Sequence, residues 1–410
     1  MQPASLRHLF ALDPSIIFLN HGSFGARPRA VLDAQDRIRR EIEASPVEFL
    51  SRRSAALLRE ALVGLGAYLG ASPDNLVFVA NATTAVNSAG ASLGLSKGDE
   101  VLAGDHEYGA CSFAMERLCE ARGASYRRFA IPLPYEGDES FLARLSAAIG
   151  PRTRTLFFSH ITSATALRLP VEGICRLARE RGLISIIDGA HAPAQVPLRL
   201  DELGADFYAG NCHKWLCAPL GSAFLYVRPE LHASVSPPVS SWGMVAEAEG
   251  GHSHDGYVGS GSLARRLQWL GTRDLSPWLS VPAALEFLRR HDGSESRERC
   301  AALAWSCATR IADMFGGALP LLESQGLRMT LAPLPQCDSG ALKSLLFDRY
   351  RIEAPIVAHA GSVYARLSFH CYNDESDATA LIEALGELFP AGVAAPVISC
   401  TAFPREAAAS

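Results

Sequence analysis

The sequence lacks the features by which several classes of protein are recognised. None of its apolar runs approaches the roughly 18 to 20 residues that a membrane span needs. The opening stretch MQPASLRHLFALDPS has no long apolar segment, so we expect no secretory signal. Positive charge is not in excess, because 38 Lys and Arg residues face 43 Asp and Glu residues and the net charge is -5. We therefore expect neither a membrane nor a nucleic acid as a partner.

The ten cysteines are too sparse for a disulfide scaffold, and none of them forms a C-x-x-C pair. This spacing argues against zinc-ribbon and thioredoxin motifs. Several cysteines, such as Cys175 and Cys307, lie in apolar segments with helical periodicity. We expect reduced thiols in the core of a cytoplasmic protein.

The stretch from Ser240 to Ser262 is rich in Gly, Ser and His and has no periodicity. It predicts a long loop, and such loops are usually functional or mobile. His252, His254 and Asp255 could hold a metal there, but the sequence offers no further ligand beside them. We expect a solvated loop tip without a metal, or a loop that covers a bound substrate.

Apolar residues, in contrast, are plentiful. They make up 48% of the 410 residues, which is ample for a large core and favours two domains. From residue 76 to residue 227, strand-like and helical segments alternate, which predicts a mostly parallel sheet with helices on both faces. The expected strands cover 76–80, 100–105, 124–131, 153–160, 183–191, 205–215 and 222–227. The expected helices between them begin near Thr83 and cover 109–122, 139–149 and 171–182.

A second, smaller α/β region follows. Its expected strands cover 327–333 and 363–369, and the tail 391–410 is rich in Ala and Pro and expected to be frayed. Helices outside the alternating region are expected over 31–45, 51–70, 276–291, 295–314, 340–350 and 375–388. We divide the chain into an N-terminal arm (1–30), a large domain (31–290) and a small C-terminal domain (291–410).

Two charged residues follow buried strands of the alternating region. Asp188 ends the strand in SIIDGAH, where ligands of open parallel sheets gather, and Lys214 lies in GNCHKW after the next apolar strand. A desolvated lysine has a lowered pKa, and its free amine can attack an aldehyde. A carboxylate facing a pyridinium nitrogen and a Schiff-base lysine are the pair that pyridoxal phosphate (PLP) requires. Taken singly, Asp188 could cap a turn and Lys214 could lie on the surface.

The stretch NATTAVN (81–87) opens a helix directly after the first strand of this region. Helix N-termini bind phosphate through free N–H groups and the helix dipole, although an ordinary threonine N-cap would give the same pattern. A phosphate site, Asp188 and Lys214, each after a strand, predict a PLP site more strongly together than any one of them does.

The sequence resembles fold-type I, class V aminotransferase-like PLP enzymes, most of all isopenicillin N epimerase and related cysteine-conjugate C–S lyases. The similar stretches span nearly the whole chain: FLNHGSFGARPR (18–29), FVANATTAVN (78–87), DHEYGA (105–110), FFSHITS (157–163), DGAHAP (188–193), DFYAGNCHKWLCAP (206–219), GTRD (271–274) and RLSFHCYN (366–373). The resemblance implies a large domain with a mostly parallel seven-stranded sheet, a smaller C-terminal α/β domain, bound PLP and a homodimer.

The resemblance also implies roles for single residues. Lys214 would hold PLP as a Schiff base and act as the base at the substrate Cα. Asp188 would pair with the pyridine nitrogen, and His191 would hydrogen-bond the phenolic oxygen. Tyr108 falls where relatives carry a His or an aromatic residue stacked on the ring, and it is the nearest candidate for a second acid.

Further roles concern the cofactor phosphate and the substrate. Thr272 would reach the phosphate of the neighbouring subunit, and Arg366 would bind the substrate carboxylate through its planar fork. On the residues alone, Arg366 could equally form a structural ion pair. Asn20 and His21 would line the substrate site from the N-terminal arm. The phosphate would be bound by Ala82, Thr83, Thr84, Asn211 and His213.

The sequence departs from its relatives near the expected site. Cysteine desulfurases carry a catalytic Cys on a loop before the carboxylate-binding Arg, but 351–365 contains none, and Cys371 is expected in the core. Where relatives commonly show SPTG, residues 163–166 read SATA, and Leu220 and Leu270 replace small or polar residues. These changes suggest a specialised amino-acid substrate.

Four functions remain open. We favour β-elimination (C–S cleavage) of an S-substituted cysteine in sulfur or secondary metabolism, because elimination needs only Lys214 as base. The similarity by itself favours an amino-acid epimerase, which also needs a second acid. A class V aminotransferase needs a second keto substrate, and a non-catalytic PLP-binding protein would not need the set of Lys214, Asp188 and Arg366.

Overall fold

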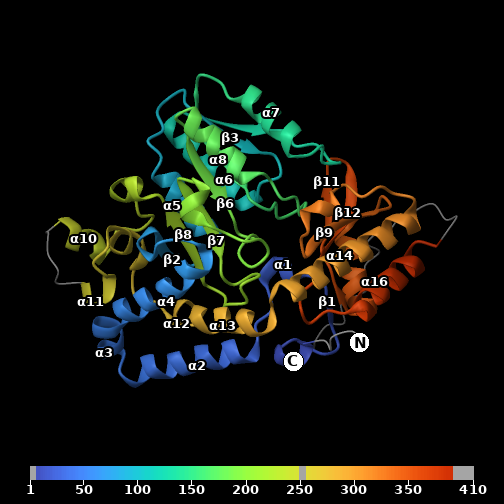
Figure 1. The fold of residues 1–410 in the computed structure, drawn as a ribbon, viewed down its shortest axis with the longest axis horizontal. Helices are drawn as coiled ribbons and strands as arrows, with labels where there is room; N and C mark the ends of the chain where they lie inside the picture. The colour runs from blue at the N-terminus through green and yellow to red at the C-terminus, as the bar shows by residue number, and fades with distance from the viewer. Residues whose placement is uncertain (1–5, 249–254, 391–410) are drawn as a thin grey trace, which may run out of the picture.

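The computed structural model describes residues 6–248 and 255–390, and its main feature is a seven-stranded sheet (Figure 1). In spatial order its strands are β2 (Leu76–Val79), β8 (Ala223–Val227), β7 (Phe207–Asn211), β6 (Ile184–Asp188), β5 (Thr153–Ser159), β3 (Glu100–Gly104) and β4 (Ser125–Phe129). Only β8 runs antiparallel to its neighbours. The predicted fold is therefore confirmed.

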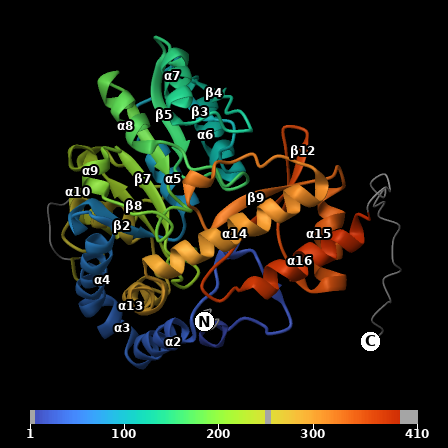
Figure 2. The same cartoon turned by 45° about the vertical axis from the view of Figure 1, so that its right-hand side comes forward.

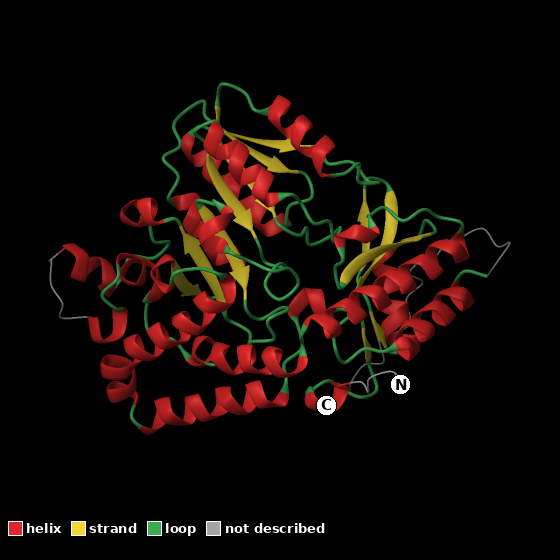
Figure 3. Cartoon of the chain, viewed as in Figure 1, coloured by secondary structure: helices red, strands yellow, loops and turns green. Residues whose placement is uncertain are grey.

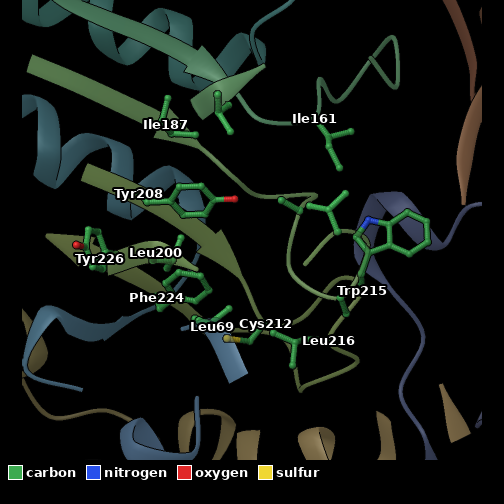
Figure 4. Close-up of a cluster of buried hydrophobic side chains, with 14 of the residues drawn as sticks. Leu69, Ile161, Ile187, Leu200, Tyr208, Cys212, Trp215, Leu216, Phe224 and Tyr226 are labelled. Carbon is green, nitrogen blue, oxygen red and sulfur yellow. The ribbon is translucent and has the colours of Figure 1, made fainter. Parts of the chain in front are cut away.

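Helices cover both faces of this sheet because side chains along each strand alternate between two apolar cores. Ile186 packs with α5 (Ala82–Ala91) and α6 (Gly109–Arg122) on one face, whereas Ile187 faces the opposite core. Figure 4 shows Ile187 in that second core together with Tyr208 and Trp215. The helices that contribute to it include α4 (Ser54–Leu69), α7 (Asp138–Ala148), α8 (Val171–Glu180), α9 (Leu200–Leu203) and α13 (Val281–His291).

A second sheet of three antiparallel strands is built from the C-terminal part of the chain (Figure 3). Its order is β11 (Ile356–His359), β12 (Ser362–Ser368) and β9 (Met329–Leu334). The helices α14 (Ser294–Phe315) and α16 (Glu375–Leu388) lie side by side, and α14 packs on β9 (Figure 2). Together with α15 (Ser339–Tyr350), these elements form a core that is separate from the two cores of the large sheet.

The N-terminal segment connects the two sheets. Strand β1 (Ile17–Phe18) pairs in parallel with β10 (Ile352–Glu353), and α1 (His21–Phe24) follows it directly. Three further helices, α2 (Arg29–Ala44), α3 (Pro46–Glu48) and α12 (Ser276–Leu279), lie on the side of the large domain where α4 and α13 pack. None of the described helices is both long and apolar enough to cross a bilayer.

Three sequence predictions differ from the structure. The expected loop 240–262 contains α10 (Trp242–Ala248) and α11 (Asp255–Val258), which are short helices held by tertiary packing. The expected helix 276–291 is broken at Ser280, because Pro282 has no N–H to continue the hydrogen-bond pattern. The short strands β1, β10 and β11 were not predicted. His252, His254 and the tail 391–410 lie outside the described residues.

Candidate active site

A cavity of about 440 Å³ opens where the carboxyl ends of β2, β5, β6 and β7 meet, between the large sheet and β12. Its volume is in the range of small-molecule sites. Nine of the residues predicted for the site line it: Ala82, Thr83, Tyr108, Asp188, His191, Asn211, His213, Lys214 and Arg366. They come from segments far apart in the sequence, and the parallel strands bring them to one edge.

Lys214 lies in the turn after β7, and its side chain points into this cavity. Burial lowers the pKa of its amine to about 8, with Arg366 adding to the effect and Asp188 opposing it. The amine nitrogen Nζ is 2.9 Å from His191 Nε2. Burial also keeps the pKa of His191 well below its ordinary value, so its ring is neutral.

The indole of Trp215 fixes which nitrogen of His191 carries the proton. Its Nε1–H can only donate, and it lies 3.4 Å from His191 Nδ1. The His191 proton is then on Nε2, which donates toward Lys214 Nζ. A nitrogen that accepts this bond must have a free lone pair, so the contact favours the unprotonated, nucleophilic amine.

Asp188 ends β6 and is 3% exposed. The Ala190 N–H donates to Oδ1 at 2.9 Å, and the Cys111 thiol also hydrogen-bonds this carboxylate. Burial raises the pKa of Asp188 despite the nearby Lys214. A buried carboxylate of this kind is stabilised by a cation, and a protonated pyridine nitrogen supplies one.

The first turn of α5 forms another part of the cavity wall. Asn81, not a threonine, is the N-cap, and its Oδ1 accepts from the Thr84 N–H at 2.8 Å. Asn211 Oδ1 accepts from the Ala82 N–H at 2.9 Å, which leaves the Asn211 amide group able to donate. Thr83 lines the cavity between these two anchored amides. The helix N-terminus and its polar neighbours suit a phosphate.

His213 is neutral, because burial lowers its pKa to about 4. Its Nδ1 donates to the Ser222 carbonyl at 2.9 Å, so Nε2 is an acceptor in this state. A phosphate dianion beside it would favour protonation, after which both nitrogens could donate.

Arg366 lies on β12 and is 5% exposed. It donates to the Ser163 carbonyl at 2.6 Å, to Asn20 Oδ1 at 3.0 Å and to Ser23 Oγ at 2.7 Å. All three acceptors are neutral, and no carboxylate of the described residues forms an ion pair with this guanidinium. Burial lowers the pKa of Arg366 to about 10, as expected for a cation without an ionic partner.

Four residues predicted for the site do not line the cavity. Asn20 Oδ1 accepts from Arg366, and His21 is completely buried against the Lys214 carbonyl, so neither is among the residues that line this cavity. Thr84 is turned toward Asn81. Thr272 is exposed and away from the cavity of its own chain.

Sequence reasoning missed several residues around Asp188. Glu107 is buried, accepts a hydrogen bond from Ser159 Oγ, and its Oε1 has no partner in the described part of the chain. Burial raises its pKa to about 8, and Asp188 adds to the shift. Cys111 belongs to an apolar core, as expected of the cysteines, but it also lines the cavity, and burial raises its thiol pKa far above the ordinary value. Glu107 stood next to Tyr108 in the motif DHEYGA, which was the available signal.

Known proteins with similar sequences and structures identify the family. The model of the class-V aminotransferase family matches residues 17–381. The chain belongs to the class-V aminotransferase family. It is 38% identical over 391 residues to isopenicillin N epimerase of Amycolatopsis lactamdurans, covering 94% of this chain and 98% of the relative. It is 26% identical to an L-cysteine desulfhydrase of Arabidopsis thaliana, covering 90% and 87%.

Solved structures support the fold. The cystine C–S lyase C-DES, in complex with its product cysteine persulfide, has a TM-score of 0.79 at 20% identity, covering 91% of this chain and 98% of that structure. Family membership confirms the predictions of a PLP-dependent enzyme and of its cofactor. The residues of the cavity fit PLP: a buried amine, a carboxylate in need of a cation, and a helix N-terminus lie in one cavity.

Proposed function

We propose that this protein cleaves the Cβ–S bond of an S-substituted cysteine by β-elimination. The observation that supports an amino-acid substrate most directly is Arg366, a buried guanidinium whose described partners are all neutral. A substrate carboxylate would supply the missing charge and accept two parallel hydrogen bonds. PLP, when bound, supplies an aldehyde for the substrate amine and a conjugated ring that accepts the electrons left at Cα.

Lys214 then acts as the base at Cα. Its pKa of about 8 is close to neutral pH, where proton transfer is most efficient, and His191 orients the amine through the 2.9 Å contact. Loss of the Cα proton lets the Cβ–S bond break, and the thiolate leaves with the bonding electrons. Hydrolysis of the remaining fragment yields pyruvate and ammonia. These steps need one base and no second acid on the other face.

Epimerisation is the second candidate, because isopenicillin N epimerase is the relative with 38% identity. It requires a group that returns a proton to the opposite face of Cα. Of the titratable residues around the cavity, Asp188 and Cys111 bond each other, and His191 is paired with Lys214. His213 is neutral and bonds the Ser222 carbonyl. Tyr108 is left as the candidate proton donor, since it lines the cavity and is 49% exposed.

The deciding experiment uses S-alkyl cysteines in heavy water with the purified holoenzyme. We expect pyruvate and free thiol. Deuterium at Cα with loss of chirality and without pyruvate would instead identify an epimerase, and Tyr108→Phe should then abolish the inversion. Lys214→Ala should remove both the absorbance of covalently bound cofactor and the turnover. An unchanged spectrum in Lys214→Ala would rule out the proposed role of this lysine.

We also propose a homodimer in which Thr272 completes the phosphate site of the neighbouring subunit. Its exposure and its distance from the cavity of its own chain support this arrangement. Thr272→Ala should weaken PLP binding. The mass of the protein in solution, measured by light scattering, tests the dimer directly.

A further inference from the structure

Residues 20–25, called here the bridging segment, lie between the two side chains on which the proposed function depends. On one side, Ser23 Oγ accepts a hydrogen bond from Arg366 at 2.7 Å. On the other side, the ring nitrogen Nε2 of His21 is 3.1 Å from the backbone carbonyl oxygen of Lys214. One short segment therefore contacts both the substrate-binding cation and the catalytic lysine.

The hydrogen bonds of His21 have a defined direction. Burial keeps the pKa of its ring well below the ordinary value, so the ring is neutral and carries one N–H. The Lys214 carbonyl can only accept, so this N–H is at Nε2. Nδ1 is then an acceptor, and the Tyr372 hydroxyl, 3.0 Å away, donates to it. Tyr372 stays protonated because burial keeps its pKa well above the ordinary value.

The backbone of the bridging segment also lies in close contact with residues 213–215, called here the lysine turn. Gly25 has a φ of 70°, and a Cβ there would lie 2.5 Å from the His213 carbonyl oxygen and 2.9 Å from that of Lys214. At Gly22 the neighbours are side chains of the small sheet, since a Cβ there would lie 2.9 Å from Met329 Sδ and from Ser368 Oγ. Because Gly25 approaches the backbone so closely, the lysine turn has little freedom to move on its own.

A metal site is the other use that the residues around His21 suggest. His21, Cys217 and His370 bring three ligand atoms together, with Cys217 Sγ 3.9 Å and 3.7 Å from the two ring nitrogens. However, His21 bonds the Lys214 carbonyl and His370 that of Trp215. The guanidinium of Arg328 also lowers the pKa of both rings, an environment that disfavours a cation. Hydrogen bonding to the lysine turn therefore accounts better for this cluster.

We propose that His21 is a positioning residue that holds the Lys214 backbone, and that the bridging segment thereby fixes the distance between the Lys214 amine and the Arg366 guanidinium. This spacing determines where Cα lies relative to the base once the carboxylate is bound. The inference rests on the proposed function, because it assumes the roles of Lys214 and Arg366 given there. It assigns His21 a role behind the cavity in place of substrate contact.

The test compares His21→Leu, which removes the N–H donor, with His21→Gln, whose side-chain amide can still donate to the Lys214 carbonyl. In the holoenzyme, His21→Leu should lower kcat about 100-fold with little change in KM, as expected for a displaced base. The pH at which the absorbance of bound cofactor changes should rise by about one unit, because the displaced Schiff-base nitrogen of Lys214 is better solvated in its protonated form. His21→Gln should restore both properties to near wild type.

The matched control is His160→Leu. His160 is also buried and hydrogen-bonded to a tyrosine hydroxyl, that of Tyr208 at 2.9 Å, but its side chain does not contact Lys214. It should lose stability to a similar degree without moving the absorbance transition. If His21→Leu does not fold, Tyr372→Phe replaces it, with a smaller shift in the same direction expected. Equal behaviour of the leucine and glutamine variants at His21 would overturn the inference.

Failure of this inference is distinguishable from failure of the proposed function. If Lys214→Ala abolishes covalent cofactor binding while His21→Leu has a wild-type absorbance transition and kcat, only the positioning role is wrong. If the wild-type protein shows no Lys214-dependent absorbance, the proposed function fails, and the positioning role fails with it.

Discussion

Two buried arginines, one just before β9 and one on its neighbour β12, have opposite electrostatic surroundings. Arg328, just before β9, is 1% exposed and lies 3.0 Å from both carboxylate oxygens of Asp292. Arg366, on β12, is 5% exposed and has only neutral acceptors among its described partners. The attraction of Asp292 raises the pKa of Arg328 despite its burial, whereas burial lowers that of Arg366.

The difference extends to the regions around them. Behind the cavity, buried carboxylates form ion pairs: Asp206 pairs with Arg228, and Glu100 pairs with Arg127. At the cavity, they are not: Lys214 has a lowered pKa, and Asp188 a raised one. Uncompensated buried charges cost stability, so their concentration at one site indicates that a ligand completes them.

The largest effect on stability is expected from Arg328→Met. Among the described residues, it would leave buried Asp292 with the partly exposed Arg297, at 3.3 Å, as its one cationic partner. Loss of one partner from a buried ion pair costs about 3 to 5 kcal/mol of unfolding free energy. Urea unfolding should show this loss, and the double variant Arg328→Met, Asp292→Leu should recover part of it. A loss below about 1 kcal/mol would contradict the view that the pair is structural.

Arg366→Ala should have the opposite effect, because it should impair activity without lowering stability. We expect kcat/KM to fall at least about 100-fold, mainly through KM, because the substrate carboxylate loses its charged partner. Unfolding free energy should be unchanged or higher, since a buried cation without an ionic partner is removed. Arg366→Lys is the control, as it keeps the charge but not the planar fork, and it should recover only part of the affinity. Unfolding as severe as in Arg328→Met would make Arg366 a structural residue.

The contrast between the two arginines could not be predicted from the sequence. Both stand in strand-like segments, LRMTLAP and VYARLSF, and the identity of their partners depends on distant parts of the chain. Asp292 is 36 residues from Arg328, and Asn20 is 346 residues from Arg366. The large sheet, Asp188 and Lys214 were predictable, because apolar runs and the residues that end them are local patterns.

The same limit explains why the orientation of His21 could not be predicted. The motif FLNHGSFG placed it near the site, but its orientation depends on the Lys214 carbonyl, 193 residues away, and on Tyr372. The pairing of Glu107 with Ser159 likewise joins the segment after β3 to the last residue of β5. Local sequence patterns do not encode which of two neighbouring residues faces the cavity and which faces the core.

Glu107 gives the smallest but most specific test of the comparison, since it is a buried acid without a cation. Burial, together with the charges of Asp188 and Asp105, raises its pKa from an ordinary 4.5 to about 8. Between these two pH values the folded protein binds more protons at this residue than the unfolded chain. The unfolding free energy therefore falls as pH rises from about 5 to 8, by at most about 1.4 kcal/mol per pH unit for one proton.

Glu107→Gln stays neutral at every pH and should lack this loss. Its stability relative to wild type, measured by urea unfolding at several pH values, should increase steadily from pH 5 to pH 8. The other titrating groups contribute equally to both proteins and cancel in the difference. Glu120→Gln, an exposed change on α6, should run parallel to wild type. If Glu107→Gln also runs parallel, Glu107 is ionised and compensated, and the contrast between uncompensated charges at the cavity and paired charges behind it does not extend to this residue.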